Sequence, residues 1–317
     1  MAESLAIGID LGGTQVRAAL VEGGTLLARA AEPTDAAGGP EAVLRQMTVL
    51  IARVAPEGRE VRGIGICSPG PLDSETGTIL NIPTLPGWDG LPLRGILAER
   101  TGLPVVLEND GIAAAFGEWR HGAGRGLRHL VYVTVSTGIG GGVVLDGRLL
   151  HGRRGMAGHV GHLPLAVDGP ACACGAPGCF EALASGSALG AAARKAVRGQ
   201  PESRLSGRDP EGLTARDVVA AAREGDALAL RLLGLEARWL GLGFVGLLHL
   251  YSPEAIVMGG GVAEAFDLLE TEIHATIRSR AMAAFRDVPV MKAGLGGNSG
   301  LIGAAALALD GSQGGPR

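Results

Sequence analysis

Residues 5–21 read LAIGIDLGGTQVRAALV, and residues 129–150 read HLVYVTVSTGIGGGVVLDGRLL. In each stretch an apolar run ends in a glycine-rich turn and a second apolar run follows, a pattern typical of two strands joined by a tight turn. A third expected strand follows each pair. Gly140 of the second stretch lies about 128 residues after Gly12 of the first. Because only two copies occur, they predict a duplicated β-β-β unit and a two-lobed architecture, not a solenoid.

Strands and helices are expected to alternate through the rest of the chain. A helix is expected over 40–54, with Pro40 at its start. The other expected strands cover 61–70, 104–110, 255–262 and 289–295, and helices are expected after 110, within 213–250 and over 301–309. This alternation favours an α/β fold with ligands at the carboxyl ends of strands. The predicted lobes are residues 1–117 with 300–317, and residues 118–299.

Composition excludes several classes of protein. The chain has 317 residues, of which 46% are hydrophobic and 54 are glycine, and it carries a net charge of −4. The apolar fraction excludes a disordered chain, and the glycines lack the three-residue period of collagen. The negative charge disfavours a general nucleic-acid binder. The longest apolar run, Trp239–Tyr251, is too short to span a bilayer, and no signal peptide is recognisable. We therefore expect a soluble cytoplasmic protein with neither nucleic-acid nor membrane partners.

Three glycine-rich segments follow expected strands. We call IDLGGT (9–14) the first glycine turn, STGIGGG (136–142) the second and VMGGGV (257–262) the third. Glycines at such positions allow backbone N–H groups to approach phosphate oxygens, and Asp10 at a strand end could hold Mg²⁺. A tight hairpin explains the first two turns at least as well. The sequence contains neither GxxxxGK[ST] nor a GxGxxG that opens a helix after the first strand, which disfavours a Walker-type P-loop and a dinucleotide-binding fold.

Taken together, the motifs resemble those of the ROK family of sugar kinases, which have the two-lobed actin/hexokinase-like (ribonuclease H-like) ATPase fold with duplicated β-β-β-α-β-α units. The matching segments are IDLGGT (9–14), LEND (107–110), TVSTGIGGGVV (134–144), AGHVGHLPLAVDGPACACGAPGCFEALASG (157–186), GGGV (259–262) and GLIGAAAL (300–307). The resemblance implies transfer of the γ-phosphoryl group of ATP to the 6-hydroxyl of a hexose or N-acylhexosamine. It also implies a homodimer.

One histidine and three cysteines lie within the most specific of these segments: His162, Cys172, Cys174 and Cys179. One imidazole and three thiols form a closed ligand set for structural zinc, although Cys-x-Cys is tighter than the usual spacing and free thiols are the alternative. The family resemblance assigns Zn²⁺ to these four residues. Such a closed site organises a loop and leaves no position for reactive water. The fourth cysteine, Cys67, is predicted to be a small core residue.

The tripeptide Glu108-Asn109-Asp110 ends an expected strand. A carboxylate there can take the proton from a hydroxyl that attacks a phosphoryl group, and the tripeptide offers two acids. Asp110 also suits the N-cap of the following helix. The resemblance makes Asp110 the catalytic base and implies sugar contacts from Asn109, Asp110 and three further positions: Gly70, Glu181 and His162.

The resemblance also implies a binding site for ATP and Mg²⁺ between the lobes. Asp10, Gly12, Gly13 and Thr14 are expected on one side of the nucleotide. On the other side Thr137, Gly138, Gly140 and Gly141 are expected at the phosphates, and Gly259, Gly260 and Gly261 near the adenosine.

Two features disagree about the sugar. Most of these kinases carry Glu three residues before the zinc histidine, whereas this chain carries His159, in the form AGHVGH that resembles the N-acetylmannosamine kinases. His159 is therefore expected to contact the sugar differently near C1 and C2. The loop SPGPLDSETGTILNIPTLPGWDGLPL (68–93) resembles that of the glucokinases instead. The favoured substrate is N-acetylmannosamine, and glucose is the alternative.

A sugar-responsive transcriptional regulator of the same family is a further alternative. Those proteins carry a helix-turn-helix ahead of the kinase-like body. Here the first glycine turn begins near residue 10, and Asp110 is retained, so catalysis is favoured over regulation.

Overall fold

The structure, a computed structural model, describes residues 4–82 and 85–311. Its contacts group these residues into two compact units: residues 4–128, 142–158 and 294–311 form the first, and residues 129–141 and 159–293 form the second. The predicted lobe boundary near residue 118 stays a prediction, because compactness does not say which segments move together. The ends of the predicted lobe, 1–3 and 312–317, lie outside the described residues.

The first unit is built on a five-stranded sheet in the order β3-β2-β1-β4-β7. Its strands are β1 (Leu5–Leu11), β2 (Gln15–Glu22), β3 (Thr25–Pro33), β4 (Val61–Ser68) and β7 (Val105–Asn109). The first three form the predicted β-β-β unit as an antiparallel meander, while β4 runs parallel to β1 and β7 parallel to β4. The carboxyl ends of β1, β4 and β7 therefore meet at one edge. A short hairpin, β5 (Leu72–Asp73) and β6 (Thr78–Ile79), follows β4.

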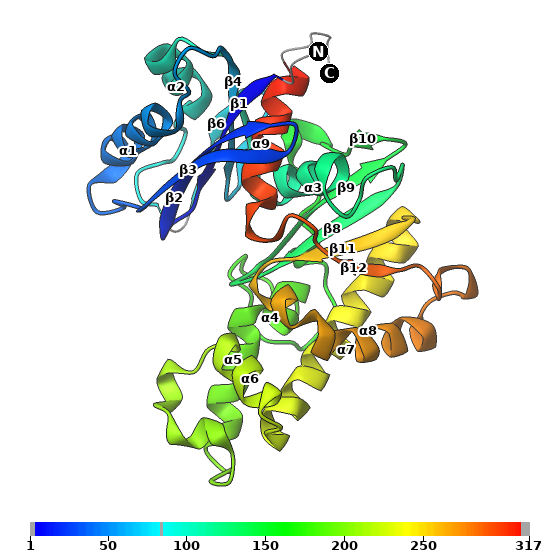
Figure 1. Cartoon of the computed structure of the whole chain (residues 1–317). Coiled ribbons are helices and arrows are strands. Elements are labelled where there is room, and N and C mark those ends of the chain that lie inside the picture. Colours follow the sequence, from blue (N-terminus) through cyan, green and yellow to red (C-terminus); the bar gives the residue numbers. More distant parts are fainter. Residues whose placement is uncertain (1–3, 83–84, 312–317) are drawn as a thin grey trace. The chain divides into compact units, whose positions relative to one another are not determined.

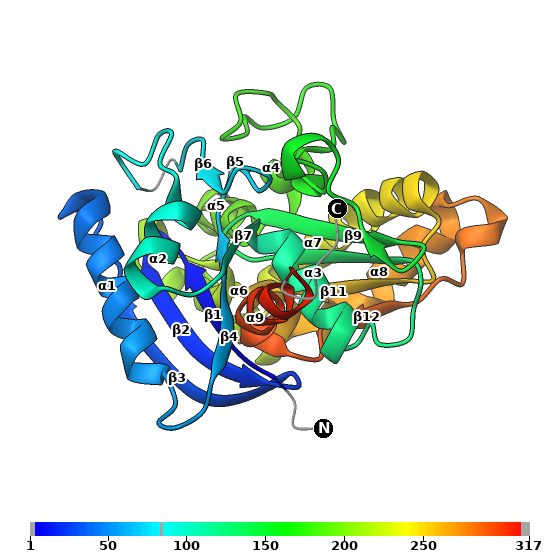
Figure 2. The same ribbon diagram turned by 90° about the horizontal axis from the view of Figure 1, so that it is seen from above.

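Helices cover both faces of this sheet. In Figure 1 and Figure 2, α1 (Gly39–Val54) and α2 (Leu93–Thr101) lie on one side, and α3 (Asp110–His121) and α9 (Ser299–Gly311) on the other. Residues such as Ile7 and Ile9 pack toward α1. The opposite face is made of small residues: a Cβ on Gly65 would lie 1.7 Å from the carbonyl oxygen of Ala304 in α9. Many glycines of the chain thus permit close packing of a helix on a sheet.

The second sheet repeats the order of the first, as β10-β9-β8-β11-β12. Its strands are β8 (Leu130–Val135), β9 (Ile139–Leu145), β10 (Arg148–Leu149), β11 (Ala255–Gly259) and β12 (Val290–Lys292). β9 begins in the second unit and ends in the first. The identical order confirms the predicted duplication and the two-lobed α/β fold class.

Four helices of the second unit lie between β10 and β11 in the chain, and one follows β11. They are α4 (Phe180–Ala184), α5 (Gly186–Val197), α6 (Ala215–Arg223), α7 (Ala227–Tyr251) and α8 (Phe266–Arg280). Among the short 3₁₀ turns, η2 (Val160–His162) precedes α4 and η5 (Gly261–Ala265) precedes α8. Within the described residues, no helix has both the length and the apolar character needed to cross a membrane.

Glu236 in α7 is a polar residue inside the apolar core of the second unit. Its side chain is 3% exposed, and among the described residues its Oε1 has no hydrogen-bond partner. Burial raises the pKa of this carboxyl well above its ordinary value. In the unfolded chain this carboxyl has a pKa near 4.5 and loses its proton above that pH, whereas the folded protein keeps the proton to a higher pH. The stability that the neutral carboxyl contributes is therefore lost as the pH rises from about 4.5 toward the folded-state pKa.

We expect Glu236→Leu to raise the free energy of unfolding by about 1–3 kcal/mol at pH 8. The gain should shrink at pH 4, where the carboxyl is protonated in both states. Urea unfolding at both pH values measures it, with Glu236→Gln as the variant that keeps shape and polarity but cannot titrate. A gain in the free energy of unfolding that does not depend on pH, or a loss at pH 8, would contradict the interpretation that Glu236 is buried as a neutral carboxyl.

Candidate functional site

The carboxyl edge of the first sheet carries Asp10 at the end of β1. Its side chain is 18% exposed and forms an ion pair with Arg17, which faces it on β2. Arg17 also donates to the carbonyl oxygen of Gly297 at 3.0 Å. Cys67, next to Asp10 on β4, is fully buried as predicted, and burial together with the Asp10 and Asp110 charges raises the pKa of its thiol.

The first glycine turn connects β1 and β2 as a tight hairpin. Gly12 N–H donates to the carbonyl oxygen of Gln15 at 3.0 Å. Thr34, just after β3, donates through Oγ1 to the Gly12 carbonyl at 2.6 Å and through its N–H to the Thr14 carbonyl at 3.0 Å. Thr34 thus holds the residues on either side of Gly13 in place by hydrogen bonds. Sequence reasoning did not identify Thr34, because its partners are about 20 residues away.

Asn109 and Asp110 lie where β7 ends and α3 begins. Asn109, not Asp110, is the N-cap: its side chain accepts the Gly111 N–H at 3.0 Å. Asp110 is the first helical residue, and its Oδ1 also accepts the Gly111 N–H at 2.7 Å. Burial, with a further contribution from the Asp10 charge, raises the pKa of Asp110 to about 6. A carboxylate with this pKa is poised to accept a proton near neutral pH.

Glu108, the other acid of the tripeptide, is engaged by the protein. It is 1% exposed, its Oε1 accepts the Asn109 N–H at 2.9 Å, and its Oε2 lies 3.0 Å from Nε2 of His151. None of the sequence motifs singles out His151. This pairing favours Asp110 over Glu108 as the acid available to a substrate. Gly70, the predicted sugar-loop residue, precedes Pro71 through a cis peptide bond and is partly exposed.

In the second unit, the second glycine turn packs against Glu181. Oε2 of Glu181 accepts the Ile139 N–H at 2.9 Å, and a Cβ on Gly138 would lie 2.3 Å from this oxygen. Packing also demands glycine elsewhere: a Cβ on Gly141 or Gly259 would meet Tyr132 at 2.5 and 2.3 Å respectively. The protein's own packing therefore explains why Gly138, Gly141 and Gly259 are glycine. Gly140 lies between the first two of these in the second glycine turn.

A cavity of about 760 Å³ lies in the second unit beside the second and third glycine turns. Ser136 and Thr137 contribute to it from the second turn, and Gly261 from the third. Its other wall comes from α5 and α6 and includes three arginines that the sequence motifs did not identify: Arg194, Arg216 and Arg223. Gly259 and Gly260, which precede Gly261, lie at the carboxyl end of β11.

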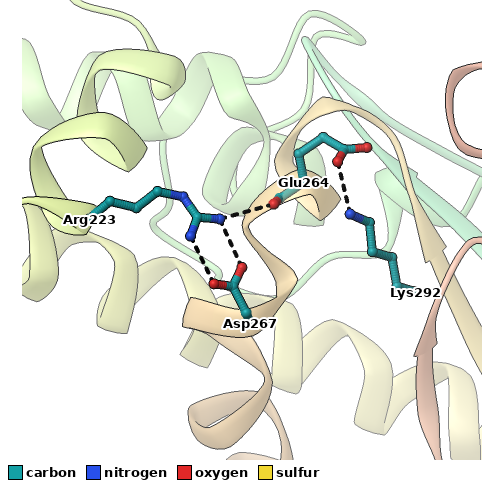
Figure 3. A network of polar contacts seen from close by, with 4 residues as sticks. All are labelled: Arg223, Glu264, Asp267 and Lys292. Atoms are coloured by element: carbon teal, nitrogen blue, oxygen red, sulfur yellow. Dashed lines mark hydrogen bonds and ion pairs between the residues drawn. The ribbon is translucent and has the colours of Figure 1, made fainter.

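A polar network holds η5, the 3₁₀ turn that borders this cavity (Figure 3). Arg223 of α6 binds both carboxylate oxygens of Asp267 in α8 at 2.9 Å and the Glu264 carbonyl at 3.2 Å. Lys292 of β12 lies 2.8 Å from Oε2 of Glu264. The network joins α6, α8 and β12 to η5 beside the third glycine turn. Its arginine hydrogen bonds lower the pKa of Asp267.

The predicted zinc ligands come together in the second unit. The ligand atoms of His162, Cys172, Cys174 and Cys179 all lie within 4.8 Å of one another. Cys172 Sγ is 3.7 Å from Nδ1 of His162, and the Sγ atoms of Cys174 and Cys179 are 3.6 Å apart. Three thiols and one imidazole at this spacing suit tetrahedral Zn²⁺. The His159 ring lies 6.3 Å from that of His162, and the pKa of His159 is lowered by partial burial and by His162.

Two sheets of identical strand order, each with a glycine turn after its first strand, define an α/β protein of the actin/hexokinase-like class. Comparison with known proteins agrees with this class and identifies one family within it. The ROK family model matches residues 6–311. The chain therefore belongs to the ROK family.

Two curated relatives extend over nearly the whole chain. Glucokinase of Thermotoga maritima is 38% identical over 306 residues, which are 95% of this chain and 96% of the relative. N-acetylmannosamine kinase of Yersinia pseudotuberculosis is 34% identical over 302 residues, 94% of this chain and 96% of the relative.

Two solved structures are similar over the same length. A glucokinase from Streptomyces griseus, in complex with glucose and AMPPNP, is 36% identical with a TM-score of 0.86, and the match covers 97% of this chain and all 100% of that one. A ROK family transcriptional regulator, a homologue of the E. coli MLC protein, has a TM-score of 0.86 and 28% identity, and the match covers 98% of this chain but 78% of the regulator.

Proposed function

We propose that this chain is an ATP-dependent hexose kinase that transfers the γ-phosphoryl group to the 6-hydroxyl of its sugar, with Asp110 as the catalytic base. The observation that carries the proposal is the carboxylate of Asp110, with a pKa near 6, at a strand edge shared with Asp10 and the first glycine turn. In phosphoryl transfer the protein mainly positions the reactants and stabilises charge. Asp110 takes the proton as the hydroxyl attacks, and Asn109 binds sugar hydroxyls.

The phosphates of ATP are assigned to the backbone N–H groups of the glycine turns. In the first unit Gly13 and Thr14 offer these N–H groups. Gly12, whose own N–H donates to the Gln15 carbonyl, lacks a side chain and so leaves room for the phosphates. Asp10 is an oxygen ligand of the kind Mg²⁺ prefers. Bound Mg²⁺ offsets negative charge on the phosphates. In the second unit, Thr137, Gly138, Gly140 and Gly141 serve the phosphates, and the cavity beside Gly261 has a volume suited to a nucleoside.

We propose glucose as the main sugar. Relatives named glucokinase are 36–38% identical to the chain, and a relative named N-acetylmannosamine kinase is 34% identical. Residues 68–93 also resemble the glucokinase loop. His159 favours N-acetylmannosamine, the substrate preferred from the motifs, as the second candidate. A neutral imidazole donates one hydrogen bond and accepts one, whereas a carboxylate only accepts, so His159 offers a substituted C2 position a donor that glutamate lacks.

An ATP-coupled assay of kcat/KM across glucose, mannose, fructose, N-acetylglucosamine and N-acetylmannosamine tests both candidates. We expect glucose to have the highest kcat/KM. His159→Glu should lower kcat/KM for N-acetylmannosamine relative to glucose, and the partly buried His274 of α8, changed to Gln, is the control. A wild-type preference for N-acetylmannosamine would reverse the order of the two candidates, and phosphorylation of none of these sugars would refute the hexose kinase. The homodimer, the cytoplasmic location and the metal ligands remain part of this proposal.

A further inference from the structure

We propose that Glu181 is a positioning residue that links the cysteine–histidine cluster to the second glycine turn, so that an intact cluster is needed for tight nucleotide binding. This inference rests on the proposed function, because it concerns the phosphoryl donor of the same reaction. The family motifs imply only a sugar contact for Glu181. All the residues that carry the link belong to the second unit.

The link begins in α4, a helix of five residues. Cys179, one of the four cluster residues, is the N-cap of α4, and Glu181 is its second residue. Phe180 between them is fully buried against Phe244 of α7, and its N–H donates to the Leu163 carbonyl at 2.8 Å. The position of Glu181 is therefore set by the cluster on one side and by the core on the other. Its Oε1 also lies 3.8 Å from Sγ of Cys172.

At its other end, the link contacts three residues of the second glycine turn: Ser136, Thr137 and Ile139. Oε2 of Glu181 accepts the Ile139 N–H at 2.9 Å. Where α4 passes into α5, the N–H of Gly186 donates to the Ser136 carbonyl at 2.7 Å and that of Ser187 to the Thr137 carbonyl at 3.3 Å. Residues 181–187 thus contact the turn on both sides of Gly138. The Glu181 carboxylate packs so closely against the turn that a Cβ on Gly138 would overlap it.

The physical consequence concerns the orientation of the turn. Three thiols and an imidazole that share a cation hold the loop 162–179 in one conformation. Without the cation the loop keeps only its backbone hydrogen bonds, such as that from the Leu165 N–H to the Gly178 carbonyl at 2.9 Å. Cys179 would then no longer fix the start of α4, and Glu181 would lose its orientation toward Ile139. Backbone N–H groups bind phosphate well only when they already point at it, so disorder in the turn weakens nucleotide binding.

The test measures binding of AMPPNP by calorimetry in the absence of sugar, with zinc content determined on the same samples. Glu181→Ala and Glu181→Gln both remove the charge, but only glutamine keeps an acceptor for the Ile139 N–H. We expect both variants to retain zinc, and the alanine variant to bind AMPPNP about tenfold more weakly than the glutamine variant, which corresponds to about 1.4 kcal/mol. Glu270→Gln, at an exposed position of α8, is the control for loss of a carboxylate and should bind as the wild type does.

A second arm removes the metal. Chelated wild-type protein should lose AMPPNP affinity by a similar factor, and chelation of Glu181→Ala should cause little further loss, because both changes break the same link. Circular dichroism verifies that the samples are folded. Equal AMPPNP binding by the alanine and glutamine variants, or additive losses on chelation, would overturn the inference while leaving the kinase proposal intact. If wild-type protein neither bound AMPPNP nor phosphorylated a sugar, both proposals would be wrong.

Discussion

Replacing Asp110 by asparagine is expected to lower kcat by about 10²–10⁴-fold, the usual contribution of a positioned general base. Sugar binding should persist, because the asparagine side chain has the same shape and Asn109 is unchanged. The fold should also persist, because Asn109 supplies the helix cap. Steady-state kinetics and sugar binding by calorimetry measure the two effects separately. Near-normal kcat in Asp110→Asn would refute the assignment of the base.

The pKa of Asp110 gives this prediction a pH signature. Its value of about 6 means that kcat/KM of the wild type should fall as the pH drops below about 6, where the base becomes protonated. Because this pKa is raised above the ordinary 3.8, the stability that the protonated form contributes is lost as the pH rises through about 6. Asp110→Asn should therefore be at least as stable as the wild type at pH 8. Asp287→Asn, at an exposed position, should change neither property.

Replacing Glu118 by alanine is expected to lower the free energy of unfolding by about 3–5 kcal/mol. Glu118 is fully buried near the end of α3. Its Oε2 accepts the N–H groups of Ala123 and Gly294, each at 2.9 Å. Its Oε1 accepts the Leu295 N–H at 2.9 Å and the Ser299 hydroxyl at 2.7 Å. Truncation leaves three part-buried N–H groups without this acceptor, while the Ser299 hydroxyl keeps only the Gly296 carbonyl, at 2.9 Å. Each lost hydrogen bond costs free energy.

Two further variants show how much of this stability comes from the Glu118 carboxylate and how much from a single hydrogen bond. Glu118→Gln keeps one acceptor oxygen but turns an amide NH₂ toward donors, so it should lose an intermediate amount of stability. Ser299→Ala removes one of the four hydrogen bonds and should cost about 0.5–1.5 kcal/mol. Urea unfolding followed by circular dichroism provides the comparison. Wild-type stability in Glu118→Ala would show that water satisfies these donors equally well.

Local patterns predicted much of the fold and part of the candidate site. The strand–turn–strand repeat predicted the duplicated sheet because side-chain alternation and glycine turns depend on neighbouring residues. The cluster of His162 with three cysteines was also predictable, since all four lie within one loop. Asn109 illustrates the limit: the tripeptide predicted a helix start, yet whether Asn109 or Asp110 forms the cap depends on backbone geometry that residue types do not specify.

By itself, the sequence determined the class of fold, the family, the three glycine turns and the candidate cluster of metal ligands, because each of these depends on residues close together in the chain. The tertiary structure alone decided which side chains meet across long separations. Glu118 binds donors up to 181 residues away, Glu108 pairs with His151, and Glu181 reaches Ile139. The arginines beside the cavity belong to the same group. Such partners are set by how helices and sheets pack, and neither periodicity nor spacing encodes that packing.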